Sequence, residues 1–156
     1  TSTALTDTNT LHYQATTFAS YYLENLEGRT FEPRPLPYPA QLSSINSIVL
    51  EDLDLDGDQD IILAGNLYSA EVETKRNDAS VGCILRNDGL GQFTSCSMRQ
   101  TGFAAPGDTK DMALLTTGAQ SLLILANNQD SLQVWQIQKE LSQSLSVDHR
   151  SFESNY

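Results

Sequence analysis

Basic residues are scarce in this sequence. Nine Lys and Arg stand against twenty Asp and Glu, which gives a net charge of -11 over 156 residues. Such a charge repels a phosphate backbone, so the composition argues against nucleic acid as a partner and favours cations. No apolar run approaches the roughly 20 residues that a membrane-spanning helix needs, and we expect no insertion into a membrane. The length suits one ordinary domain or a few structural repeats.

Cysteine is also scarce, because only Cys83 and Cys96 occur. They have no further Cys and no suitably spaced His beside them, which argues against a zinc thiolate site. The two residues flank the turn signal NDGLG. If that turn joins two antiparallel strands and folds about Gly89 and Leu90, Cys83 lies opposite residue 95 or 96. A cross-strand disulfide and two separately buried thiols are both open.

The usual motifs of catalysis are missing as well. The sequence has no G-x-S-x-G segment and no phosphate-binding loop, and its two histidines, His12 and His149, lie in the terminal segments. Paired acids could in principle hydrolyse a glycoside, but a bound metal explains their density better. We therefore expect that the chain is not an enzyme.

Convincing helical periodicity is absent, and short β-branched runs dominate instead. We predict strands at 45–51, 60–65, 80–86, 92–98, 110–116, 121–127 and 131–138. Upstream, FASYYLE and RTFEPRPL indicate the last two strands of a preceding unit. The Pro-rich EPRPLPYP cannot donate a full ladder of hydrogen bonds, so we expect it to leave its sheet and cross to the next unit.

Two pairs of segments repeat at the same offset of 62 residues. NLEGRTF at 25–31 aligns with NDGLGQF at 87–93, and IILAGN at 61–66 aligns with LILANN at 123–128. Four antiparallel strands in each such unit suggest the blades of a β-propeller, with a β-sandwich as the alternative. Propellers have about four to eight blades. Since this chain offers about two and a half, it belongs to a longer protein, assembles with copies of itself, or forms an open stack.

These units predict five regions. They are an N-terminal extension (1–17), the last strands of a preceding blade (18–40), a complete blade with an acidic loop (41–107), a following blade without that loop (108–140), and a C-terminal strand or tail (141–156).

The acidic loop lies in the segment LEDLDLDGDQDIILAG at 50–65. Counted from Asp52 as position one, carboxylates fall at positions one, three, five, seven and nine, which are Asp52, Asp54, Asp56, Asp58 and Asp60. Gly57 at position six permits a sharp turn, and ligation by oxygen alone favours calcium over magnesium. Without a cation, two carboxylates about 5 Å apart repel by about 3 kcal/mol at an effective dielectric near 20.

The spacing differs from an EF-hand at a definite place. An EF-hand needs a bidentate Glu at position twelve and flanking helices, whereas position twelve here is Leu63, inside an apolar run. Asp60 would therefore close the site, and the loop would join two strands. The corresponding segment of the next unit, TTGAQS at 116–121, carries no carboxylate. We expect one unit to hold calcium and the other not.

The segments DLDLDGDQDIILAG and ILRNDGLGQFTS together resemble FG-GAP or VCBS repeats, as in the propellers of integrin α-subunits and in secreted bacterial proteins. The resemblance spans about residues 18–138. It implies side-chain ligation of Ca²⁺ by Asp52, Asp54, Asp56 and Asp60, with Asp58 contributing through its main chain. It also implies a secreted or cell-surface protein that serves adhesion or ligand binding.

The connection GNLYSAEVETKRND at 65–78 is the longest in the complete unit, and long loops on a rigid scaffold often carry recognition. Tyr68, Lys75, Arg76 and Asp78 are its candidate contacts for a glycan or an extracellular protein, against a packing role between blades. An accessory module or catalytic part of a calcium-dependent polysaccharide-processing enzyme is the alternative function.

Overall fold

The computed structural model describes residues 11, 13–69, 71, 73–118, 120–139 and 146–150, the last five as backbone alone. Within these residues the chain forms ten strands and two short helical segments. They are β1 (Tyr21–Leu26), β2 (Thr30–Pro35), η1 (Tyr38–Gln41), β3 (Ser47–Glu51), β4 (Asp60–Ala64), β5 (Cys83–Asn87), β6 (Phe93–Cys96), α1 (Met98–Thr101), β7 (Thr109–Thr117), β8 (Gln120–Asn127), β9 (Gln133–Gln138) and β10 (Ser146–Arg150).

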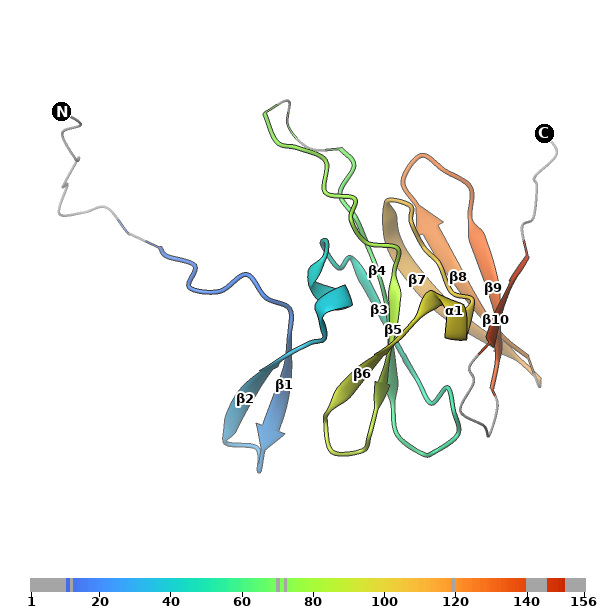
Figure 1. Ribbon diagram of the computed structural model, residues 1–156, viewed down its shortest axis with the longest axis horizontal. Helices are drawn as coiled ribbons and strands as arrows, with labels where there is room; N and C mark the ends of the chain where they lie inside the picture. The colour runs from blue at the N-terminus through green and yellow to red at the C-terminus, as the bar shows by residue number, and fades with distance from the viewer. Residues whose placement is uncertain are drawn as a thin grey trace.

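The strands form three antiparallel sheets (Figure 1). β1 and β2 make a two-stranded sheet, and β3 to β6 and β7 to β10 make two four-stranded sheets in which strands adjacent in sequence are hydrogen-bonded neighbours. The all-β prediction is confirmed, and each predicted strand is present with ends that shift by at most three residues. β10 pairs with β9, so the C-terminal region predicted as a strand or tail contains a strand.

The two hairpins aligned at the 62-residue offset share their register. Asn25 pairs with Phe31 between β1 and β2, and Asn87 pairs with Phe93 between β5 and β6. In each turn the Asn side chain accepts a hydrogen bond from a glycine amide, which is Gly28 in the first hairpin (2.9 Å) and Gly89 in the second (3.2 Å). The two hairpins therefore share their strand register and a hydrogen bond from a glycine amide to the Asn side chain, although this glycine lies three residues after Asn25 and two residues after Asn87.

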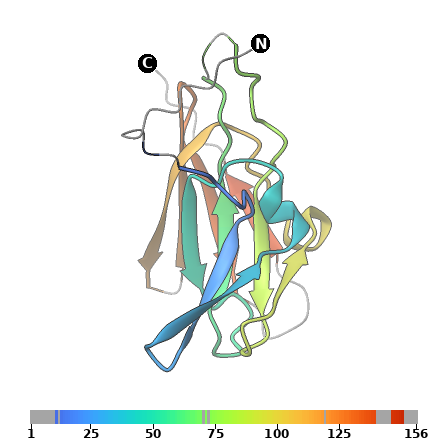
Figure 2. The ribbon, with the colours of Figure 1, turned by 90° about the vertical axis from the view of Figure 1, so that its left-hand side faces the viewer.

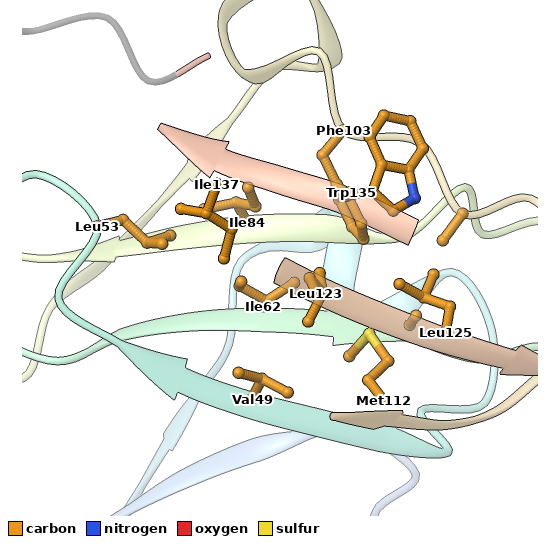
Figure 3. Close-up of a cluster of buried hydrophobic side chains, with 12 residues drawn as sticks. Val49, Leu53, Ile62, Ile84, Phe103, Met112, Leu123, Leu125, Trp135 and Ile137 are labelled. Atoms are coloured by element: carbon orange, nitrogen blue, oxygen red, sulfur yellow. The ribbon is translucent and has the colours of Figure 1, made fainter. Parts of the chain in front are cut away.

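The main core lies between the two four-stranded sheets (Figure 3). It holds Val49, Leu53, Ile62, Ala64 and Ile84 from the first sheet and the β3–β4 loop, Met112, Leu123, Leu125, Trp135 and Ile137 from the second, and Phe103 and Ala105 from the connection between them. The rings of Phe103 and Trp135 meet edge to face at 5.6 Å. Face-to-face packing of this kind is how antiparallel sheets bury their apolar sides.

The β1–β2 hairpin lies on the other side of the β3–β6 sheet (Figure 2). A second cluster there contains Ile61, Leu63 and Leu85, and the Tyr22 ring meets the Phe93 ring at 5.2 Å. Two strands cover only part of a four-stranded face, so Ile48 and Leu50 on β3 stay exposed. No helix among the described residues has the length and apolarity to cross a bilayer.

Of the two alternatives for the cysteines, the structure has the two separate thiols and no cross-strand disulfide. Cys96 pairs with Ile84, because the hairpin is centred on Leu90 and the register is displaced by one residue from the expected one. Successive side chains of a strand point to opposite faces. Cys83 therefore joins the cluster under β1–β2, whereas Cys96 packs against the main core. Both thiols are free, as in the alternative of two separately buried cysteines.

Candidate metal centre

The loop at residues 52–59 joins β3 to β4 and lies at the same end of the molecule as the β5–β6 turn (Figure 1). Its backbone turns sharply, with positive φ angles of 62° at Leu55 and 97° at Gly57. A glycine tolerates this conformation without strain, and a leucine does not. Leu53, fully buried in the main core, fixes the start of the loop.

Three carboxylates converge inside this loop. One oxygen each of Asp52, Asp54 and Asp56 lies within 4.8 Å of the others. The loop backbone holds two of these side chains: Asp52 Oδ2 accepts the amide hydrogen of Gly57 (3.2 Å), and Asp56 Oδ1 accepts that of Asp58 (2.9 Å). The predicted ligands at positions one, three and five are thus brought together.

Two buried carboxylate oxygens of this cluster have no hydrogen-bond donor among the described residues. Asp54 is only 8% exposed. Among the described residues, Oδ1 of Asp52 and Oδ1 of Asp54 are buried and accept no hydrogen bond. A buried polar atom without a partner is costly, and converging oxygens without donors are what a hard cation requires. The three residues therefore fit a divalent cation, and their donor set suits calcium.

Asp60 has a different position. It is fully buried, and its two carboxylate oxygens accept the amide hydrogens of Leu53 (3.1 Å) and Asn87 (2.9 Å). Burial raises the pKa of Asp60, against the effect of these two hydrogen bonds and with that of the neighbouring acidic charges. Asp60 lies outside the group of three and ties the loop to the β5–β6 hairpin.

Asp58 also lies outside the group of three. Its carboxylate faces the β5–β6 turn so closely that a Cβ added at Gly89 would lie 2.4 Å from Asp58 Oδ2. Gly89 also has a φ of +75°, so two separate reasons favour glycine there. The side chain of Asp58 therefore packs the loop against the β5–β6 turn. Only the main chain of Asp58 remains for the predicted ligand role.

The structure adds a residue that the sequence analysis missed. Arg86, on β5, forms an ion pair with Asp54. Nothing in the local sequence links the two residues, because they meet only when β5 pairs with β4 and lies beside the loop. A second cation at this end, Lys139, pairs with Glu51 at the end of β3.

The candidate recognition loop extends from the opposite end of the molecule (Figure 1). Arg76 stacks on the Tyr68 ring, 3.3 Å from its centre, and also pairs with Asp78 at 3.0 Å. The Tyr68 hydroxyl donates to the carbonyl of Pro106 at 2.5 Å. Three of the four predicted contacts are therefore engaged in holding the loop, and Lys75 takes no part in these bonds.

Comparison of the chain with protein families, with curated proteins and with solved structures finds no match. The candidate centre consequently stands on its own geometry. Of the two histidines, His12 lies outside the described residues, and His149 is described as backbone alone.

Proposed function

We propose that this chain is a calcium-stabilised, non-catalytic segment of FG-GAP or VCBS type, from a secreted or cell-surface protein. The observation that carries the proposal is the convergence of Asp52, Asp54 and Asp56 within 4.8 Å, with buried oxygens that accept no hydrogen bond. Extracellular fluid supplies the millimolar calcium that weak sites need, which supports an external location.

The arrangement of the sheets supports a propeller segment. Two consecutive four-stranded sheets pack face to face, and the two-stranded β1–β2 sheet lies on the outer side of the first. The shared register of the Asn25–Phe31 and Asn87–Phe93 hairpins supports a repeated unit. In this proposal β1 and β2 are the last strands of a preceding blade, and further blades come from a longer chain or from other copies.

Calcium would act by holding the β3–β4 connection and not by chemistry. A ligand that binds only the folded state stabilises it by about 2.7 kcal/mol at a hundredfold excess over Kd. For a chain of this size that corresponds to a rise in melting temperature of about 5–10 °C. Thermal unfolding in calcium and in EDTA measures the difference directly.

The variant Asp56→Asn removes one charge and keeps an acceptor for the Asp58 amide. It should lose most of the calcium-dependent rise. Asp130→Asn is the matched control, because Asp130 is an exposed turn residue whose Oδ1 accepts the Ser131 amide hydrogen in a comparable way. It should keep the full rise. Equal melting temperatures of the wild-type protein in calcium and in EDTA would contradict the proposal.

For the partner, we propose a glycan or an extracellular protein that contacts the loop at 65–78. The support is the length of this loop and its internal contacts, in which Arg76 stacks on the Tyr68 ring and the Tyr68 hydroxyl donates to the carbonyl of Pro106. A glycan array combined with an activity screen on acidic polysaccharides tests this. We expect binding that weakens in Lys75→Ala and no turnover. Turnover that is lost on mutation of a residue outside the acidic loop would instead favour the enzyme.

A further inference from the structure

Arg86 occupies an unusual place beside the acidic loop. Its guanidinium pairs with Asp54 Oδ2, and the side chains of the two residues are 35% and 5% exposed. A buried carboxylate is expensive to leave unpaired, so this contact neutralises the most deeply buried acid of the three.

The same carboxylate is one of the three that a cation would use. An ion held by Asp52, Asp54 and Asp56 would lie within a few ångströms of the guanidinium. Two positive groups at that separation repel each other, and both draw on the oxygens of Asp54. Full ligation by Asp54 and an intact ion pair with Arg86 therefore oppose each other.

The surroundings give the guanidinium room to leave. A cavity of about 370 Å³ lies beside it, lined by Asp56, Arg86, Asn87, Asp88 and Thr94. Asp88, whose Oδ1 accepts the amide hydrogens of Leu90 and Gln92, supplies a carboxylate on this wall. The Arg86 guanidinium can thus move away from Asp54 and still have solvent and a carboxylate counter-ion, that of Asp88, beside it.

We infer that Arg86 is a built-in counter-ion that holds Asp54 while the loop is free of metal and that calcium displaces it on binding. The inference rests on the proposed function, since it concerns the same calcium site. Its consequence is twofold: the loop stays folded in the absence of calcium, and calcium binds more weakly than it would to the three carboxylates alone.

The test compares Arg86→Met with Arg34→Met by calcium titration calorimetry and by melting in EDTA. Arg34 is a matched control, because its side chain is 37% exposed and pairs with Glu24, and it also donates to the carbonyl of Leu90 in the neighbouring turn. Arg86→Met should bind calcium about tenfold more tightly and melt at a lower temperature in EDTA. Arg34→Met should bind calcium as the wild type does.

A second measurement distinguishes direct displacement of the Arg86 side chain by calcium from a general effect of its positive charge on calcium affinity. The side-chain ¹⁵N resonance of Arg86, assigned by its absence in Arg86→Lys, should shift on addition of calcium, while that of Arg34 stays in place. Arg86→Lys also covers a failure of the Met variant to fold, and its calcium affinity should exceed that of the wild type.

Three outcomes overturn the inference, and they differ in what else they affect. If the wild-type protein gives no calcium-binding heat, the proposed function fails together with the inference. If it binds calcium but Arg86→Met binds no more tightly, or if the Arg86 resonance does not move, the inference fails and the proposed function stands.

Discussion

The first hairpins of the two four-stranded sheets differ in the number of residue pairs between their strands and in the length of the loop that joins them. β3 and β4 form five residue pairs and are joined by the acidic loop at 52–59. β7 and β8 form eight pairs and are joined by residues 118–119 alone. The sheet with the short ladder has the long acidic loop, and the sheet with the long ladder has the tight turn.

This difference indicates what each hairpin depends on. Antiparallel strands joined by a two-residue turn gain their register from the ladder and from the turn itself. A longer connection costs more entropy to close and needs contacts of its own. In the acidic loop these contacts are the burial of Leu53, the two hydrogen bonds to Asp60 and, by our proposal, the cation.

We expect the largest effect from replacement of residues 52–59 by the dipeptide Gly-Ala, which makes the β3–β4 connection as short as the β7–β8 connection. Glu51 pairs with Asp60 as Thr117 pairs with Gln120, so the short linker matches the register of both hairpins. The replacement removes the buried Leu53 side chain, at a cost of about 2–5 kcal/mol, and removes the cation ligands. We expect lower stability by chemical denaturation and no response to calcium.

The control for this replacement is Leu53→Ala in the intact loop. It should lose the same apolar contacts and still gain stability from calcium. A calcium-dependent rise in the melting temperature of the loop replacement would show that the cation binds outside residues 52–59, which contradicts the assignment.

Much of this fold follows from the sequence because its signals are local. The short β-branched apolar run of DIILAG and the turn residues of NDGLG predict β4 and the β5–β6 hairpin directly, since strand propensity and turn chemistry act over a few residues. The helix α1 also has a local signal in the sequence. Ser97 and Gln100 form a capping box, which the spacing S-x-x-Q announces.

The remaining features depend on contacts between distant residues. Spacing alone could place five aspartates in one loop, but it could not separate the three that converge from Asp60, whose carboxylate binds the Asn87 amide 27 positions away. The ion pair of Arg86 with Asp54 has the same origin. The choice between a disulfide and two separate thiols depended on a single residue of register, because the centre of the turn decides which face each cysteine occupies.

The cysteines offer the finest test of whether the two hairpins respond separately to calcium. Cys83 lies in the sheet with the acidic loop, and its burial, with a smaller effect from nearby Cys96, raises its pKa to about 11. Alkylation at pH 8 therefore requires opening of the sheet, since the thiolate is the reactive form. In a Cys96→Ser background, a hundredfold excess of calcium over Kd should slow labelling of Cys83 by up to about 100-fold.

The matched reporter is Ser121→Cys in a Cys83→Ser, Cys96→Ser background. Ser121 lies on β8 and is 7% exposed, close to the 8% of Cys83, so both thiols need local opening before they react. If the β7–β8 ladder holds without the ion, labelling at position 121 keeps its rate when calcium is added. Equal slowing at both positions would mean that the shared core opens as one unit, and the proposed division between a hairpin held by calcium and a hairpin held by its ladder would be wrong.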